Sequence, residues 1–137
     1  MRSTIYHLRV EFGDCDPFNI VHYPNFYRWF DAATQQLFVE ASLTREHLRK
    51  EFGVVGMPVL ETGARYQSPG RFGDRLAIEC SLVEFGRKSI RLRHVVKHGA
   101  DLLVDGFEVR ALVEPHPDDP QRIRAMELTE AIRRTLA

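Results

Sequence analysis

The sequence is poor in cysteine and in long apolar runs, and both shortages narrow the classes it can belong to. Cys15 and Cys80 are the only cysteines among 137 residues, and they form no C-x-x-C motif. One disulfide is possible, but two free thiols in a reducing cytoplasm are expected. No stretch reaches the roughly 18 apolar residues of a membrane span, and the first residues lack the apolar core of a secretory signal.

An excess of charge of one sign is also missing. Nineteen Lys and Arg balance 19 Asp and Glu, so the formal net charge is zero. Non-specific binding to nucleic acid or to an anionic membrane depends on net positive charge, so neither partner is expected. Only three of the 19 cations are lysine. The others are arginine, which is better suited to bidentate phosphate contacts.

The composition is that of a folded domain. Hydrophobic residues make up 44% of a chain of 137 residues, which is the size of one domain, so residues 1–137 are expected to form one. Alternation of apolar and polar residues from Tyr6 to Phe12 predicts a first strand. Pro24 suits the first turn of a helix of roughly 18–20 residues. The apolar stripe of this helix is broad and comprises Phe26, Trp29, Phe30, Ala32, Ala33, Leu37, Phe38 and Ala41.

Three further segments carry helix or loop signals. Thr44 can cap a second, short helix that runs to about Phe52, and Gly53 ends it. The segment Glu114–Pro120 contains three prolines and is expected to form a rigid loop. Thr129 can cap a C-terminal helix that ends near Leu136.

The rest of the chain is rich in Val, Ile, Leu and Phe, which predicts strands at Pro58–Tyr66, Arg75–Phe85, Ser89–His98 and Leu102–Val113. The short breaks between the last three strands favour antiparallel hairpins. The element order then predicts an α+β fold, in which an antiparallel sheet of about five strands wraps one long apolar helix. Free sheet edges and an uncovered outer face favour a homo-oligomer.

Several kinds of reaction lack their motifs here. The sequence has no G-x-S-x-G nucleophile elbow, no Walker A motif and no G-x-G-x-x-G loop. His94 and His98 are four residues apart, but their segment is strand-like, so sheet-face or solvated histidines are favoured over a zinc site. An enzyme of this sequence is therefore expected to work with side chains alone, without a metal or a cofactor.

One short segment combines an acidic turn with the start of the long helix. Asp16 lies seven residues before Tyr23, and backbone N–H groups at a helix start can bind an oxyanion. If the turn folds back, Asp16 could attack a carbonyl carbon or deprotonate a water, while the Tyr23 N–H polarises the carbonyl oxygen. The alternative is that Asp14 and Asp16 are ordinary turn or capping residues.

The same segment, Glu11–Asp31, closely resembles the catalytic segment of the 4-hydroxybenzoyl-CoA thioesterases of the hotdog-fold superfamily. In that family D-x-D-P precedes I-V-x-Y-P-N and an aromatic-rich helix with an acidic residue at its end. A weaker resemblance extends over nearly the whole chain. It implies a hotdog fold, hydrolysis of an aromatic acyl-CoA thioester, and Asp16 as nucleophile or general base. It also implies an assembly of hotdog dimers, with a homotetramer expected.

The resemblance implies roles for residues that would contact the acyl group. Asp31 matches the acidic position that reaches the ring hydroxyl in the family. An ion pair with Arg28 is the alternative that the residues themselves offer. Phe26 and Trp29 belong to an aromatic cluster that could stack on a flat acyl group, although most of that cluster is expected to pack the helix against the sheet. Thr62 is expected near the pocket, without an assigned role.

Coenzyme A would need cationic partners for its phosphates. Arg87 and Lys88 lie in an expected hairpin, with Arg91 and Arg93 beyond them, and Ser89 could add a hydrogen bond. Arg122 and Arg124 are spaced to share a strand face. In the resembled family, counterparts of the hairpin Arg/Lys and of the C-terminal Arg pair bind the nucleotide phosphates. Exposed arginines are usually solvated, so the resemblance and not the spacing supports these assignments.

Two positions depart from the family pattern. Asn19 stands where the resembled segment usually has Gly, and because Asn tolerates a left-handed backbone the turn is expected to persist. His22 stands where an apolar or aromatic residue is commoner, and could alter acyl choice or act as an acid or base. Three alternatives stay open: a short-chain acyl-CoA or acyl-carrier-protein thioesterase, a hotdog hydratase or dehydratase using Asp16 and His22, and a non-catalytic acyl-CoA-binding module.

Overall fold

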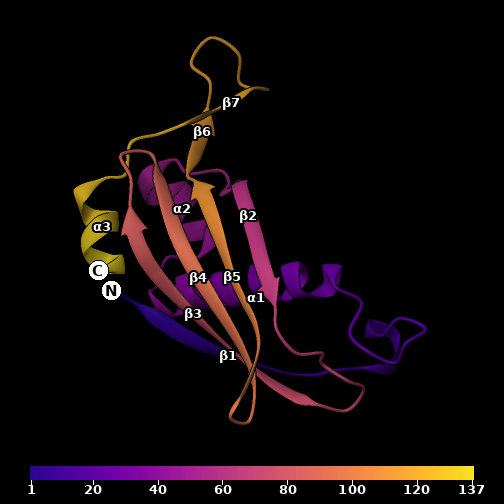
Figure 1. Cartoon of the computed structure of the whole chain (residues 1–137). Coiled ribbons are helices and arrows are strands. Elements are labelled where there is room, and N and C mark those ends of the chain that lie inside the picture. The colour runs from indigo at the N-terminus through magenta and orange to yellow at the C-terminus, as the bar shows by residue number, and fades with distance from the viewer.

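One antiparallel sheet of five strands forms the body of the molecule, in the order β1-β3-β4-β5-β2 (Figure 1). The computed structural model describes all 137 residues. The strands are β1 (Ser3–Arg9), β2 (Val59–Tyr66), β3 (Arg75–Phe85), β4 (Ser89–His98) and β5 (Asp101–Ala111). The predicted hairpins join β3 to β4 and β4 to β5. β1 and β2 are therefore the two edges of the sheet.

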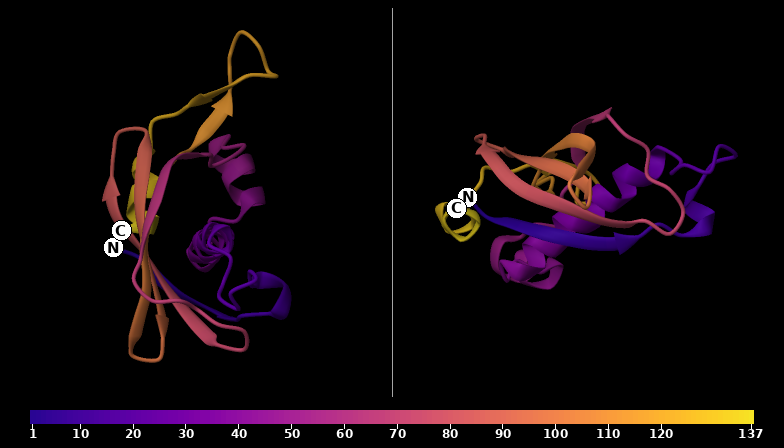
Figure 2. Two further views of the ribbon diagram at one scale, coloured as in Figure 1. Left: turned by 45° about the vertical axis from the view of Figure 1, so that its right-hand side comes forward. Right: turned by 60° about the horizontal axis from the view of Figure 1, so that its bottom comes forward.

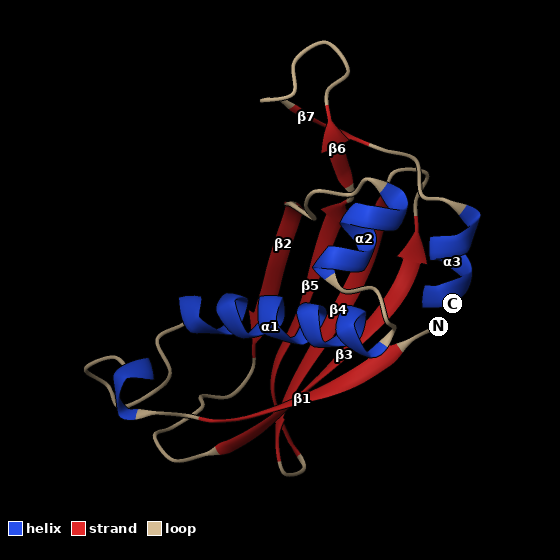
Figure 3. Cartoon of the chain, turned by 180° about the vertical axis from the view of Figure 1, so that it is seen from behind, coloured by secondary structure: helices blue, strands red, loops and turns tan.

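The long helix α1 (Pro24–Glu40) lies across the concave face of this sheet, which curves around it (Figures 2 and 3). Its buried side chains are most of the predicted apolar stripe and one polar residue, namely Phe26, Trp29, Phe30, Ala33, Thr34, Leu37 and Phe38. Of the remaining predicted members, Ala32 is half-buried and Ala41 follows the end of the helix. Alternate residues of β3 and β4 meet the buried side chains from the sheet side, as the two-residue period of strands requires. The core therefore sits between α1 and the sheet, and the order of layers agrees with the prediction.

Two short helices, α2 and α3, lie where the sequence predicts them. α2 (Arg45–Phe52) begins where the Thr44 hydroxyl accepts a hydrogen bond from the His47 N–H, and ends at Gly53 with φ 70°. α3 (Glu130–Leu136) is capped in the same way by Thr129. Both caps confirm the predictions, because these side chains satisfy N–H groups that a helix start leaves free. None of the three α-helices has the length and apolarity needed to cross a lipid bilayer.

The end of the first strand differs from the prediction. β1 stops at Arg9, and Phe12–Asp14 form a single 3₁₀ turn, η1, in which Phe12 is 79% exposed rather than buried. The Asp14 carboxylate accepts the Glu11 N–H at 2.8 Å. This hydrogen bond stabilises a turn where the alternation of residue types alone predicted more strand.

The last predicted strand is also wrong at its C-terminal end. Strand β5 ends at Ala111, and β6 (Val113–Pro115) pairs with β7 (Ile123–Ala125) in a separate two-stranded ribbon (Figure 1). Val113 instead exchanges backbone hydrogen bonds with the segment before β2, to Gly56 O at 3.0 Å and from Val55 N at 2.9 Å. The expected rigid loop of Glu114–Pro120 is therefore partly strand.

Candidate active site

Asp14 ties the acidic turn to the start of α1. Its carboxylate pairs with the Arg28 guanidinium at 2.9 Å as well as with the Glu11 N–H. Its carbonyl oxygen accepts from the Asn25 side-chain amide and from the His22 N–H, each at 2.8 Å. The capping role considered for Asp14 is confirmed, and these bonds hold the turn against the helix.

Asp16 is placed differently, with only part of its carboxylate engaged. Its Oδ1 accepts the Phe18 N–H at 2.8 Å, and its backbone bonds to Ile20 and Asn19 close the turn. Oδ2 accepts no hydrogen bond from the chain. Asn19 has φ 63°, so the left-handed turn persists without glycine, as predicted. The turn thus presents a half-buried carboxylate with one oxygen available.

The Tyr23 N–H is the amide at the start of α1 and has no partner in the chain. Tyr23 is the N-cap residue and Pro24, which follows it, has no N–H. The N-terminus of a helix carries partial positive charge from the aligned peptide dipoles. This amide can therefore donate to an oxygen that becomes negative.

Asp16 and Tyr23 line one cavity of about 320 Å³. Phe26 is the third predicted site residue in its wall, and the remaining lining comes from Ile20, Val21 and the segment Tyr66–Gly70. The bridge between Ile20 and Arg71 brings that segment beside the turn. The structure therefore places Asp16 and Tyr23 in the wall of the same cavity, which the sequence predicted only on condition that the turn folds back.

Tyr66 is a member of this cavity that the sequence reasoning missed. Its ring centroid lies 6.3 Å from that of Tyr23 and 5.9 Å from that of Phe26. Burial, and then the neighbouring Tyr27 hydroxyl, raise the pKa of Tyr66, so it stays a neutral phenol. No local pattern marks Tyr66, because only the pairing of β2 with β5 carries the end of β2 to the start of α1.

Three other predicted residues near the turn do not line this cavity. Trp29 is buried in the core, edge-on to Phe26 at 5.3 Å. His22 is exposed, with its ring 5.6 Å from that of Tyr23. Thr62 lies on edge strand β2, where its hydroxyl donates to the Phe107 carbonyl at 2.8 Å. Their contacts with an acyl group stay predictions.

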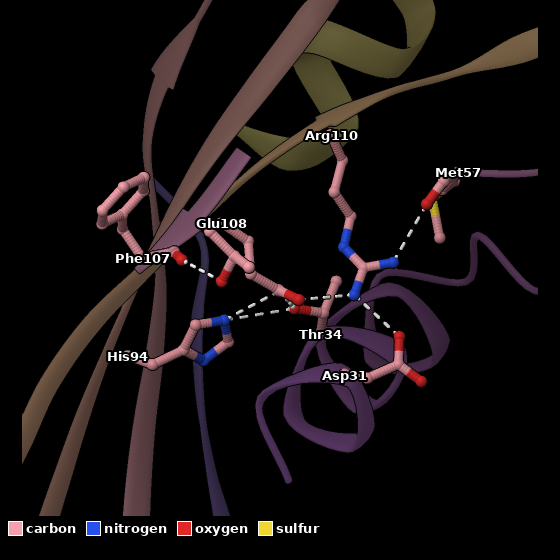
Figure 4. Close-up of polar contacts among 8 residues, drawn as sticks. Asp31, Thr34, Met57, His94, Phe107, Glu108 and Arg110 are labelled. Atoms are coloured by element: carbon pink, nitrogen blue, oxygen red, sulfur yellow. Dashed lines mark hydrogen bonds and ion pairs between the residues drawn. The ribbon is translucent and has the colours of Figure 1, made fainter. Parts of the chain in front are cut away.

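Asp31 lies further along α1 in a second cavity of about 700 Å³, which is lined by residues of α1, α2 and the segment Val54–Met57. The expected alternative, an ion pair with Arg28, is wrong, because Arg28 pairs with Asp14. Asp31 Oδ1 instead accepts from Arg110 Nη2 at 2.7 Å (Figure 4). The Asp31 side chain is 57% exposed, so its carboxylate is held from inside and open from outside.

Behind Asp31 is a buried polar cluster that the sequence reasoning also missed (Figure 4). Glu108 Oε2 accepts from Arg110 Nη2 at 2.6 Å, and Oε1 accepts from the Thr34 hydroxyl at 2.6 Å and faces His94 Nε2 at 2.9 Å. Burial alone would raise the pKa of Glu108, but the hydrogen bonds from His94 and Arg110 lower it to about 2. Two charged residues at alternate positions of an apolar strand were the available signal.

Comparison with known proteins agrees with this geometry. The model of the family described as the thioesterase-like superfamily matches residues 10–126. A 4-hydroxybenzoyl-CoA thioesterase from Pseudomonas sp. strain CBS-3 is 36% identical over 133 residues, which cover 93% of this chain and 92% of that protein. The chain belongs to the 4-hydroxybenzoyl-CoA thioesterase family. The expected enzyme class, a thioester hydrolase, is thereby confirmed.

Solved structures of thioesterases have the same fold. A mutant 4-hydroxybenzoyl CoA thioesterase complexed with 4-hydroxybenzoyl CoA aligns over 100% of both chains, with 34% identity and a TM-score of 0.89. A gentisyl-coenzyme A thioesterase aligns over 97% of this chain and 98% of its own, with 27% identity and a TM-score of 0.79. The predicted hotdog fold is confirmed.

In this family member the residues expected to hold CoA phosphates belong to the β3–β4 hairpin and to β7 or its start, and these elements lie at the other end of the sheet from the turn before α1 (Figure 1). Arg87 pairs with Glu127 at 3.3 Å, and its carbonyl accepts the Leu128 N–H, so the C-terminal segment runs beside the β3–β4 hairpin. Arg124 on β7 pairs with Glu114 at 2.9 Å. Lys88 and Arg122 form no ion pair within the chain, and the Ser89 hydroxyl forms no hydrogen bond within it.

Arg91 and Arg93 do not extend this basic cluster. Arg93 makes two hydrogen bonds to Asp105, at 3.0 and 2.7 Å, and Arg91 lies over the Phe107 ring at 4.4 Å. Both are therefore occupied on the outer face of the sheet.

The thioesterase shows no cluster of three or more His, Cys, Asp or Glu side chains that could hold a metal ion. His94 is buried against Glu108, whereas His98 is exposed and lies 3.7 Å from Asp74. His94 thus lies on the core side of the sheet, and His98 lies at its exposed end. Cys15 and Cys80 are both free thiols, as expected.

Proposed function

We propose that this thioesterase hydrolyses an aromatic acyl-CoA of the 4-hydroxybenzoyl type to the free acid and CoA. The observation that supports it best is that Asp16, which has one carboxylate oxygen without a partner, and Tyr23, whose N–H has no partner in the chain, line one cavity. The 36% identical relative is named for this substrate. A related structure holds 4-hydroxybenzoyl CoA in a mutant in which an aspartate is replaced by asparagine.

The reaction needs only these two groups at the thioester. The Tyr23 N–H donates to the carbonyl oxygen and stabilises its developing negative charge. In one course Asp16 attacks the carbonyl carbon, the C–S bond breaks, CoA leaves as a thiolate, and water hydrolyses the acyl-aspartyl anhydride. In the other course Asp16 takes a proton from the attacking water and returns it to the departing sulfur. Neither course calls for a metal or a cofactor.

Asp31 would then accept a hydrogen bond from the ring hydroxyl of the acyl group. Tyr23, Tyr27 and Asp31 follow one another at spacings of four residues, which places them along one stripe of α1. The hydratase alternative has less support than hydrolysis, because the 36% identical relative is named as a thioesterase.

We also propose that two copies of the chain complete each site. Ile20 bridges to Arg71 just before β3, whereas Arg87 follows the end of that strand. An 11-residue strand is about 35 Å long, which is longer than an extended pantetheine arm. A second copy would supply the phosphate-binding groups that the first holds too far away.

The unpaired edge of β2 is the surface proposed to join the copies. Its backbone pairs with β5 on one side alone, and Val59 and Leu60 are 43% and 62% exposed. Unprotected strand edges with apolar side chains favour association. Light scattering should give the mass of a dimer or tetramer. The variant Leu60→Lys should shift it toward 15.9 kDa, whereas Val83→Lys, on β3, should not. A wild-type monomer would contradict the proposal.

The activity itself is tested by thiol release from a panel of 4-hydroxybenzoyl-, benzoyl- and butyryl-CoA. The proposal expects the highest kcat/KM on 4-hydroxybenzoyl-CoA and the lowest on butyryl-CoA. Preference for butyryl-CoA would move the assignment to the short-chain alternative, and binding without thiol release would favour the non-catalytic one.

A further inference from the structure

We propose that Arg110 is a positioning residue which holds Asp31 toward the acyl group, and that the buried Glu108–Arg110 pair thereby sets the preference for hydroxylated acyl groups. This inference rests on the proposed function. It concerns side chains of β5 that contact no substrate themselves.

The guanidinium joins three elements around Asp31 (Figure 4). Nη2 donates to Asp31 Oδ1 on α1 at 2.7 Å and to Glu108 Oε2 on β5 at 2.6 Å, and Nη1 donates to the Met57 carbonyl at 3.0 Å. Met57 and Asp31 line the same cavity. The planar fork of arginine can serve all three acceptors at fixed angles, whereas the single nitrogen of lysine cannot.

Glu108 is itself fixed from the other side. The Thr34 hydroxyl donates to Oε1, and His94 Nε2 lies 2.9 Å from the same atom. His94 Nδ1 is buried with no partner, so the ring carries its proton on Nε2, where Glu108 can accept it. Phe30 stacks flat on His94, with 4.5 Å between centroids and 8° between planes. Glu108 therefore has no freedom to leave Arg110.

The charges of the cluster do not cancel. Arg110 and Glu108 are each 4% exposed and neutralise one another. Asp31 adds a second carboxylate to the same nitrogen, which leaves one negative charge over. It resides on Asp31, the exposed member, whose Oδ2 has no partner in the chain. A carboxylate in this position is a ready acceptor for a phenol hydroxyl and a poor neighbour for an unsubstituted ring.

The direction of the Asp31 side chain also favours contact with the acyl group. Side chains of a helix lean toward its N-terminus, which for Asp31 is the end where Tyr23 and Asp16 lie. Arg110, anchored on the sheet, restricts the carboxylate to one place along that stripe. The distance from thioester to hydroxyl that the enzyme accepts is therefore set by Arg110 together with α1.

The test compares kcat/KM for 4-hydroxybenzoyl-CoA and benzoyl-CoA in Arg110→Lys. Loss of a hydrogen bond to a charged group lowers kcat/KM about tenfold or more. The ratio of kcat/KM for 4-hydroxybenzoyl-CoA to that for benzoyl-CoA should therefore fall by about that factor. Arg93→Lys is the matched control. It changes the same residue type in an arginine–carboxylate pair on the outer face, and its ratio should not change.

A second variant keeps the inference testable if Arg110→Lys does not fold. Glu108→Gln retains the shape of the cluster but removes the charge that neutralises Arg110. Arg110 then binds Asp31 more tightly, and the Asp31 carboxylate becomes less available to the ring hydroxyl of the acyl group. The same ratio should fall again. Equal losses on both substrates, or an unchanged ratio in folded protein, would overturn the inference and leave the proposed function intact. A wild-type protein that releases thiol from neither substrate would overturn both.

Discussion

Two carboxylates two residues apart have different surroundings in the acidic turn. Asp14 is 14% exposed, and hydrogen bonds engage both its carboxylate oxygens. Asp16 keeps one oxygen unengaged and lines the cavity. The motif D-x-D-P therefore combines a residue that holds the turn with one that can react. Sequence could not separate the two, because both are acidic and both lie in the same turn.

Glu108 gives a prediction at the same scale, for stability against pH. Its folded pKa is about 2, below the usual 4.5, so its ionised form stabilises the fold. That contribution is complete above about pH 4.5 and is lost as the pH falls toward 2. The shift corresponds to about 3 kcal/mol at neutral pH.

Urea unfolding of wild type and Glu108→Gln between pH 7 and pH 2 measures this effect. The difference in free energy of unfolding between the two proteins should be largest near pH 7 and should shrink below pH 4.5, because the protonated Glu108 resembles Gln. A difference that stays constant with pH would contradict the assigned ionisation.

At the scale of elements, the close contact of α1 with β5 depends on one glycine. A Cβ added at Gly106 would lie 2.6 Å from the Phe30 ring and 3.1 Å from the Gly63 carbonyl. Gly106→Ala should therefore lower the free energy of unfolding by about 1–3 kcal/mol. At Gly13 an added Cβ meets nothing within 4 Å, so Gly13→Ala is the control for denaturant unfolding. Equal stability of the two variants would count against the packing described.

Much of this level could be predicted from the sequence. Periods of two and 3.6 residues located the strands and α1, and capping residues located both short helices. The predicted end of β1 was wrong because a hydrogen bond from the Glu11 N–H to the Asp14 carboxylate, and not residue type, ends the strand there. The β6–β7 ribbon was not predicted because β7 begins ten residues after the start of β6 in the chain, beyond a proline-rich loop.

The site was predictable only where its residues are local in sequence. Asp16 and Tyr23 belong to one segment, whereas Tyr66, Glu108 and Arg110 come from strands that only the folded sheet brings to α1. The resemblance to the family supplied Asp31, but not the group that holds it. Long-range pairing of this kind leaves no periodic trace, so it required the structure.

In the whole molecule, the turn before α1 and the β3–β4 hairpin with β7 lie at opposite ends of the sheet (Figure 1). We propose that the two ends serve different steps: the turn before α1 carries out the chemistry, and the β3–β4 hairpin with β7 retains the nucleotide. A variant that no longer binds the nucleotide should still hydrolyse thioesters, and a variant that no longer hydrolyses them should still bind CoA.

Replacing Arg122 and Arg124 together by Gln tests that separation. We expect KM for CoA thioesters to rise about tenfold or more, because two charge-assisted contacts to phosphate are lost. Activity on a truncated N-acetylcysteamine thioester, which has no phosphates, should change little. Equal losses on the long and the truncated substrate would contradict the assignment of phosphate binding to this ribbon.

Asp16 is the proposed reacting carboxylate, and the rest of the proposed mechanism depends on it. The most direct test is kcat for thiol release from 4-hydroxybenzoyl-CoA in Asp16→Asn, with Asp118→Asn, an exposed loop residue, as the matched control. The account predicts a loss of roughly a thousandfold or more for Asp16→Asn, with little change in affinity for CoA, and wild-type turnover for the control. An Asp16→Asn enzyme that keeps more than about a tenth of wild-type kcat would contradict it.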